Sequence, residues 1–142
     1  MNTALGRTLA IDYGRKRIGL AISDPLGIIA SPAGYIERRA GKRPPITKIL
    51  ARANELGAQG YLIGLPLDGE GHETAWTAEV RQFGAEIAKR TGMPVRFYDE
   101  RFTTAAALRT VKEMEQSTRG RKGDVDALAA AILLQHALNA ST

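Results

Sequence analysis

Residues 8–23 have the sequence TLAIDYGRKRIGLAIS, in which two β-rich runs flank a short turn. The runs cover residues 8–11 and 17–23, and Gly14 lies between them, which predicts a β-hairpin. Asp12 interrupts the first apolar run. A carboxylate in such a strand is costly unless it is paired or bound to a metal ion, so this position favours a functional acid.

Beyond the hairpin, helical and strand patterns alternate along the chain. Tyr35 and Ile36 indicate a third strand after Pro32 and Gly34. Helices are predicted at residues 46–56, 74–90, 103–114 and from Asp124 onwards, and strands at residues 60–65 and 95–98. This order predicts an α/β fold with a mixed five-stranded sheet flanked by helices. We expect one domain over residues 1–142.

The composition favours an anionic partner and a reducing compartment. Lys and Arg number 20 against 15 Asp and Glu, and the formal net charge is +5. There is no cysteine, no export signal and no stretch of about 18 uncharged apolar residues, so we expect a cytoplasmic protein without a membrane partner. The basic residues gather in three clusters: Arg15, Lys16 and Arg17; Arg38, Arg39, Lys42 and Arg43; Arg119, Arg121 and Lys122. A solvated basic face is the alternative for each cluster.

Three acids fall near the ends of predicted elements. Asp12 and Glu100 follow strands, and Asp126 lies early in the last helix. Carboxylates at one edge of a sheet can converge on divalent cations, because Mg²⁺ and Mn²⁺ prefer hard oxygen ligands. The pattern therefore predicts metal-assisted phosphodiester chemistry. The structural alternatives are an ion pair between Asp12 and Arg17, and an Asp126 that only complements the helix dipole.

Other acids compete for the same role. Asp99 and Glu100 are adjacent, and neighbouring strand positions point to opposite faces, so only one of them should aim at the site. With the last strand at the edge of the sheet, two spacings or roughly 10 Å from the first, Glu100 must reach inward. Asp68, at the end of the fourth strand, is a reserve ligand. Asp124 is expected to be the N-cap of the last helix.

The remaining notable side chains are expected to be structural. His72 lies in a turn-rich loop and His136 near a helix end, where a solvated imidazole is ordinary, so neither is expected to bind a metal. Trp76 and Phe83 lie seven residues apart on one helical face, which favours the core over a base-stacking platform.

Four motifs, in order and covering nearly the whole chain, resemble the YqgF/RuvX family: DYGRKRIGLAISDP, IGLPLDGEG, FYDERFTT and KGDVDALAAAILLQ. Members of this family are named for Holliday junction resolution and are now usually regarded as pre-16S rRNA nucleases. The resemblance implies an RNase H-like fold, a cytoplasmic location and a metal-dependent nuclease that matures the 5′ end of 16S rRNA. The chain departs from the family pattern at Leu67, Asp68 and Gly69, where members often carry Asn with Met.

The resemblance assigns the catalytic and metal-binding roles to Asp12, Glu100 and Asp126, with Mg²⁺ or Mn²⁺ as the cofactor. In a two-metal arrangement, ions about 4 Å apart would activate water and steady the leaving oxygen. Basic side chains beside these acids are expected to hold substrate phosphates. They are Lys16, Arg17, Arg101, Arg121 and Lys122.

Three other functions stay open. A homodimer could cut branched DNA symmetrically, and no residue reads a 2′-hydroxyl, so the preference for RNA rests on the resemblance. A catalytically silent RNA-binding assembly factor is the second. The third is an ATPase, because DYGRKRIG also resembles the phosphate-binding turn of the actin and sugar-kinase superfamily, although those enzymes need two domains around a cleft.

Overall fold

The computed structural model describes residues 6–39, 41–104 and 122–140. Its elements, in chain order, are β1 (Thr8–Tyr13), β2 (Arg17–Ser23), β3 (Ala30–Glu37), α1 (Ile46–Leu56), β4 (Gly60–Leu65), α2 (Ala75–Thr91), β5 (Val95–Asp99), a 3₁₀ turn (Glu100–Phe102) and α4 (Lys122–Ala140). No helix in these ranges is both long enough and apolar enough to cross a membrane.

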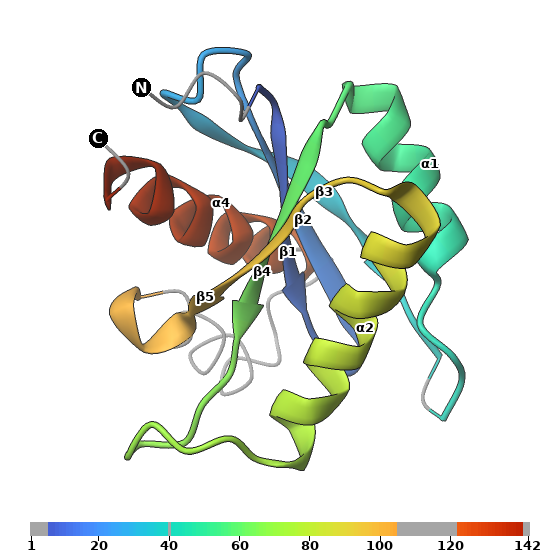
Figure 1. Ribbon diagram of the computed structural model, residues 1–142, viewed down its shortest axis with the longest axis vertical. Helices are drawn as coiled ribbons and strands as arrows, with labels where there is room; N and C mark the ends of the chain where they lie inside the picture. Colours follow the sequence, from blue (N-terminus) through green and yellow to red (C-terminus); the bar gives the residue numbers. More distant parts are fainter. Residues whose placement is uncertain (1–5, 40, 105–121, 141–142) are drawn as a thin grey trace.

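The five strands form one mixed sheet in the order β3-β2-β1-β4-β5. β1, β2 and β3 pair antiparallel, whereas β4 is parallel to β1 and to β5. The predicted α/β fold with a five-stranded sheet is therefore confirmed. α4 covers one face of the sheet, and α1 and α2 cover the other (Figure 1).

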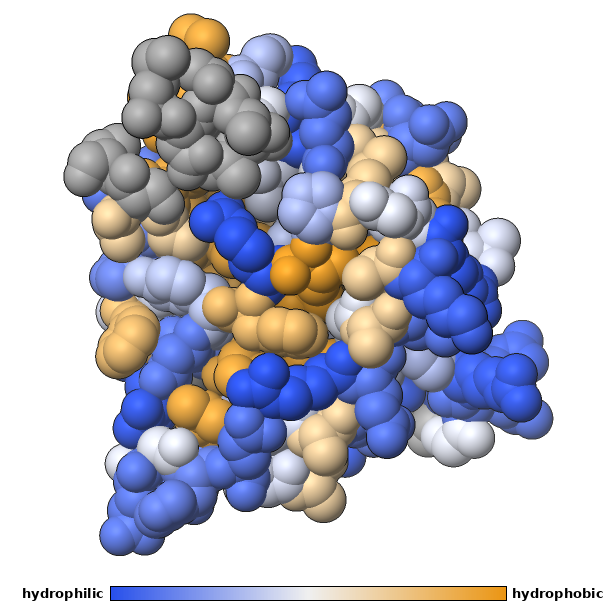
Figure 2. Space-filling model, viewed as in Figure 1, coloured by the Kyte–Doolittle hydropathy of each residue, from blue (hydrophilic) through white to orange (hydrophobic). Residues whose placement is uncertain are grey.

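The strands differ in how far they are covered. Every residue of β1 and of β4 is buried, as expected for central strands with helices on both faces. β5, at the edge, is half-buried along its length. Figure 2 shows apolar surface gathered over this edge strand, with hydrophilic side chains around it.

Two boundaries differ from the sequence prediction. β1 continues to Tyr13 instead of ending at residue 11, so Asp12 lies inside the strand. The N-cap assigned to Asp124 is wrong, because α4 begins at Lys122 and Asp124 lies in its first turn. Most of the helix predicted at 103–114 lies outside the described residues.

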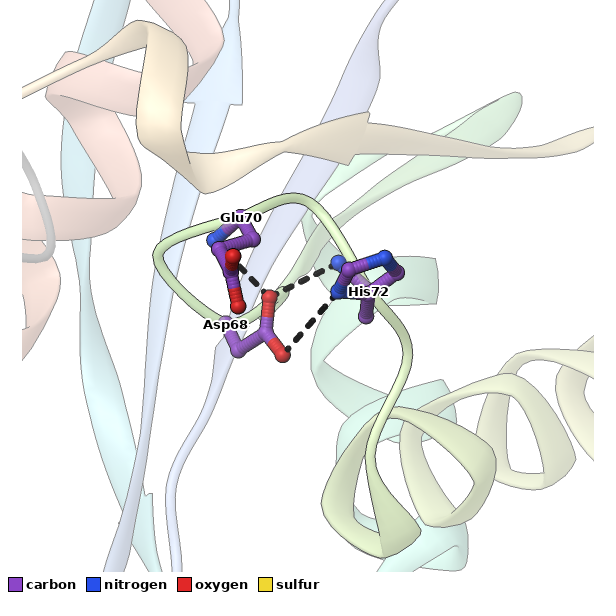
Figure 3. Close-up of side chains that lie close together, drawn as sticks. All are labelled: Asp68, Glu70 and His72. Atoms are coloured by element: carbon purple, nitrogen blue, oxygen red, sulfur yellow. Dashed lines mark hydrogen bonds and ion pairs between the residues drawn. The ribbon is translucent and has the colours of Figure 1, made fainter.

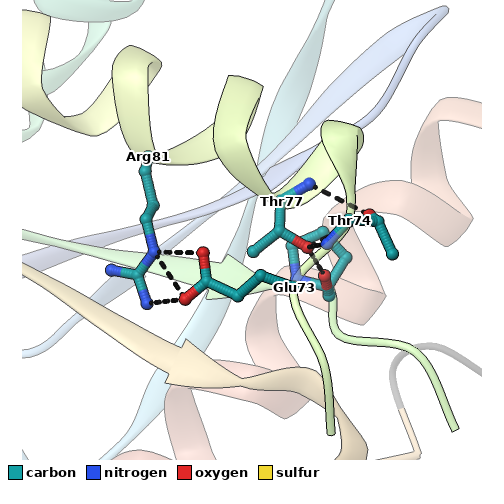
Figure 4. A network of polar contacts seen from close by, with 5 residues as sticks. Glu73, Thr74, Thr77 and Arg81 are labelled. Carbon is teal, nitrogen blue, oxygen red and sulfur yellow. Dashed lines mark hydrogen bonds and ion pairs between the residues drawn. The ribbon is translucent and has the colours of Figure 1, made fainter.

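Side-chain hydrogen bonds define the start of α2. The Thr74 hydroxyl accepts from the amide of Thr77, and the Thr77 hydroxyl accepts from the amide of Thr74, so two amides of the first turn are satisfied (Figure 4). The Thr77 hydroxyl also donates to the carbonyl of Pro66, which ties the helix to the end of β4. Arg81 is paired with Glu73, which lies just before the cap, at 2.6 Å.

α4 lies unusually close to the sheet. Its buried face is rich in alanine, which adds little bulk between the helix and the strands. At Gly19 on β2 there is no room for any side chain, since a Cβ atom there would lie 2.1 Å from the backbone oxygen of Asp126. Gly19 therefore sets the distance between β2 and α4.

We predict that Gly19→Ala lowers the free energy of unfolding by about 1–3 kcal/mol, because the methyl group meets backbone that cannot rotate away. Urea unfolding measures the change. Gly69→Ala is the matched control, since a Cβ at Gly69 has no atom within 4 Å. The control should stay within about 0.5 kcal/mol of wild type. Equal stability of the two variants would contradict the close contact.

Candidate active site

Asp12 lies at the centre of the sheet, on the face covered by α4. Leu9, Ile11 and Tyr13 belong to the core under α1 and α2, whereas Ala10 belongs to the core under α4. Because side chains alternate along a strand, Asp12 shares the face of Ala10. Asp12 is 2 % exposed.

Two glycines flank Asp12 on this face. Gly19 is its cross-strand partner on β2. On β4, Gly64 follows Ile63, the partner of Ile11, so it stands level with Asp12. The row Gly19, Asp12, Gly64 therefore leaves space on both sides of one carboxylate.

The other two predicted acids occupy that space. The backbone of Asp126 lies directly over Gly19, and Oε1 of Glu100 would be 2.7 Å from a Cβ placed on Gly64. Glu100 is 5 % exposed and Asp126 is 4 % exposed. The structure thus brings Asp12, Glu100 and Asp126 to one region of the α4 face, from three different elements.

The inward reach of Glu100 has a local cause. Glu100 is not a strand residue, because β5 ends at Asp99 and the chain turns into the 3₁₀ turn. The Asp99 carboxylate accepts from the amide of Arg101, and the Thr103 hydroxyl donates to the carbonyl of Glu100 at 3.1 Å. These bonds hold the turn that directs Glu100 back over β4.

Asp99 has a structural partner instead. Arg101 donates to both of its carboxylate oxygens, with a shortest distance of 2.8 Å. The Arg101 guanidinium lowers the pKa of Asp99, mainly by hydrogen bonding, and the pKa of Arg101 is raised in return. Of the two adjacent acids, Glu100 is the buried one, and its side chain lies beside Gly64 on β4.

Arg17 pairs with Asp126 rather than with Asp12. Its Nε lies 2.9 Å from Oδ2 of Asp126, and the two side chains are 20 % and 5 % exposed. Arg17, predicted to contact phosphate, therefore also fixes the position of one acid. Asp126 is not a first-turn residue of α4, so the helix-dipole alternative loses its main support.

For the two other predicted phosphate contacts whose side chains are described, the structure shows no ion pair with Asp12, Glu100 or Asp126. Lys16 is exposed in the turn between β1 and β2. Arg101 lies with its guanidinium 3.1 Å from the position of a Cβ on Gly71. Arg121 and the side chain of Lys122 lie outside the described residues.

A second group of possible metal ligands lies in the loop after β4. Asp68, Glu70 and His72 bring their ligand atoms within 4.8 Å of one another, and within residues 6–39, 41–104 and 122–140 no other group of three or more does so (Figure 3). Oδ1 of Asp68 accepts from the amides of Glu70 and His72 at 2.9 and 2.8 Å. Asp68, expected as a reserve ligand beside Asp12, thus faces its own loop.

This loop group was not predicted from the sequence, because His72 was expected to be structural. The available signal was the spacing D-x-E-x-H, with glycines between the ligands. The group is largely exposed, and its atoms are held by the turn itself. It offers a carboxylate and imidazole donor set for a divalent metal, whereas the buried acids offer oxygen alone.

Comparisons with known proteins agree with this architecture. A family model described as "RuvX: Holliday junction resolvase" matches residues 6–140. A protein of Clavibacter michiganensis subsp. michiganensis named "Putative pre-16S rRNA nuclease" is 40 % identical over 134 residues, which are 94 % of this chain and 83 % of the relative. A protein of the same name from Koribacter versatilis is 38 % identical over 130 residues, 92 % of this chain and 84 % of the relative.

Two solved structures of RuvC share the fold. The Thermus thermophilus RuvC structure superposes with a TM-score of 0.56 at 16 % identity and covers 95 % of each chain. RuvC of the same organism in complex with a Holliday junction substrate gives a TM-score of 0.53 at 17 % identity, over 96 % of this chain and 95 % of that chain. The RNase H-like fold predicted from the sequence is confirmed.

We predict that Arg17 and Asp126 are energetically coupled. Arg17→Gln and Asp126→Asn should each destabilise the protein, and a double-mutant cycle should give a coupling energy of about 0.5–3 kcal/mol, because the pair is mostly shielded from water. The exposed pair Arg52 and Glu55 is the control, with a coupling below about 0.5 kcal/mol. Similar coupling for both pairs would contradict the special role of Arg17.

We also predict that Arg101→Gln raises the pKa of Asp99 towards its ordinary value of about 3.9. Because the folded-state pKa is lowered, the pair contributes stability above the ordinary pKa and loses it as pH falls through the folded value. NMR titration of the carboxyl carbons measures the change. Asp24 is the control, since its pKa is lowered mainly by the amides of Ile29 and Ile28, and it should not respond.

Proposed function

Because the chain belongs to the RuvX family, we propose that it is a metal-dependent nuclease that hydrolyses phosphodiester bonds of precursor 16S rRNA at the 5′ end. The observation that carries this proposal is the burial of three acids, from three different elements, around the Gly19, Asp12, Gly64 row. The names of the relatives at 38–40 % identity support the substrate.

We propose Asp12, Glu100 and Asp126 as the ligands of the metal. The donor set is all hard oxygen, which suits Mg²⁺ or Mn²⁺ better than softer metals. When bound, the metal would lower the pKa of an attacking water and stabilise charge on the phosphate. In the chain itself, burial strengthens every charge interaction at the site, and Arg17 holds Asp126 in place.

Basic side chains would position the substrate. Lys16 is exposed at the end of the hairpin next to Asp12, where it can contact a phosphate without giving up an ion pair with a described residue. Arg17 and Arg101 are each paired with an acid, so their contribution is a pre-oriented positive potential. Arg121 and Lys122 stay predicted substrate contacts.

The family description names Holliday junctions, so branched DNA is the second candidate substrate. The names of the sequence relatives favour rRNA. A cytoplasmic location follows from a ribosomal precursor as substrate. We further propose that residues 1–142 act as one domain, and that a homodimer is needed only if the substrate is a four-way junction.

Cleavage of a precursor 16S rRNA 5′ leader and of a four-way DNA junction should be measured side by side with Mg²⁺ or Mn²⁺. We expect the wild type to cut the rRNA leader and to lose this activity with a chelator. Asp12→Asn, Glu100→Gln and Asp126→Asn should each lower the rate by roughly 100-fold or more, because the acids act as one unit.

Glu55→Gln, on the exposed side of α1, is the matched control and should cleave at the wild-type rate. Full activity of Asp12→Asn would refute the catalytic assignment and would favour the alternative function, an RNA-binding assembly factor. Cleavage of the junction alone would replace the rRNA substrate by branched DNA.

A further inference from the structure

A basic cleft opens on the face of the sheet opposite the three acids. It consists of two cavities of about 750 Å³ and 430 Å³ that share Arg38, Lys42 and Glu79. Tyr13 and Phe83, which belong to the core under α1 and α2, line the larger cavity. Neither cavity includes Asp12, Glu100 or Asp126, so the cleft is separate from the candidate active site.

The cleft carries excess positive charge. Its two acids are already engaged, since Glu86 pairs with Arg90 at 2.8 Å and Glu79 accepts from the Tyr13 hydroxyl at 3.2 Å. Burial raises the pKa of Tyr13 to about 12, so the hydroxyl keeps its proton. Three cations that line the larger cavity have no ion pair with any described residue: Lys42, Arg43 and Lys48.

Arg38 is the buried centre of the cleft. Its side chain is only 8 % exposed, so this member of the second basic cluster is not part of a solvated face. Nη1 donates to the carbonyl of Gly14 at 3.1 Å, Nη2 lies 3.6 Å from Glu79, and the guanidinium lies over the Tyr13 ring. Nε is a buried donor for which the described residues supply no acceptor. A buried donor without an acceptor is costly, and an oxygen atom of a bound anion would supply the missing acceptor.

The N-terminus of α1 opens into the same cavity. The helix has eleven residues, its N-cap is Pro45, and no side chain caps it. Its first turn holds no acid, and Thr47 and Lys48 line the cavity. Free amides at a helix start attract phosphate, so this end and Arg38 favour the same ligand.

The turn between β1 and β2 connects the cleft with the acids. Asp12 and Tyr13 are consecutive, and they face opposite sides of the sheet. Arg15, in the turn, lies over the ring of Trp76 at 4.0 Å from its centroid, and both line the smaller cavity. Arg15 and Lys16 are both exposed in this turn, so positive charge continues from the hairpin that carries Asp12 to the cleft.

We propose that this cleft binds a phosphate of the nucleic-acid substrate several nucleotides away from the cleaved bond, through Arg38, Lys42, Arg43 and the start of α1. This inference rests on the proposed nuclease function, which supplies the polyanion. The cleft lengthens the substrate footprint, so that a strand is held on both faces of the sheet during cleavage.

The test uses full-length protein with Asp12→Asn, which we expect to bind without cutting. Affinity for a single-stranded rRNA leader is measured against salt concentration. Lys42→Glu with Arg43→Glu should weaken binding by about tenfold or more and lower the salt slope by roughly 0.7, for one lost phosphate. Arg39→Glu with Lys89→Glu is the matched control, with the same charge change at two exposed residues that line neither cavity.

Trp76 is the single tryptophan, so its fluorescence reports on the smaller cavity. We expect RNA to change this fluorescence at concentrations where inorganic phosphate alone does not. Equal losses in the two double variants would overturn the proposal, and so would saturation by free phosphate as tight as by RNA. If the wild type binds RNA through the cleft but cuts neither substrate, the proposed nuclease function is wrong, whereas the proposal that the cleft binds nucleic acid is supported.

Discussion

The structure depends on one packing constraint: two glycines at the centre of the sheet leave room around a buried aspartate. Gly19 lets the backbone of α4 touch β2, and Gly64 lets the side chain of Glu100 lie over β4. Any side chain at either position would push one acid away from Asp12. The candidate site therefore depends on the absence of side chains at Gly19 and Gly64 as much as on the presence of the three carboxylates.

Burying three carboxylates is costly unless cations or hydrogen bonds compensate. Arg17 supplies one such cation to Asp126, and Arg101 pairs with Asp99, the neighbour of Glu100. The acids thus keep their oxygen atoms in a low-dielectric setting, which suits a site that is completed by divalent metal.

Consecutive residues of β1 contribute to two different sites, one on each face of the sheet. Asp12 serves the face under α4, whereas Tyr13, the next residue, supports Arg38 and the basic cleft on the other face. The hairpin turn between them is basic. A nuclease of this size can thereby bind a longer stretch of polyanion than a site on one face would allow.

The sequence by itself determined the order of the elements and the five-stranded sheet, and it singled out three acids that the structure buries in one region. Local signals were sufficient there: Gly57 follows the end of α1, Thr74 caps α2, and Asp12 stands out as an acid within an apolar strand. These features depend on neighbours along the chain, so periodicity and capping rules predict them.

Only the tertiary structure decided which groups meet. The pairing of Arg17 with Asp126 joins residues 109 positions apart, and the inward turn of Glu100 depends on a 3₁₀ turn that Asp99 and Thr103 hold. The burial of Arg38 likewise requires α2 to bring Glu79 beside it. Such contacts arise from the packing of distant segments against one sheet, and no local sequence pattern encodes that distance.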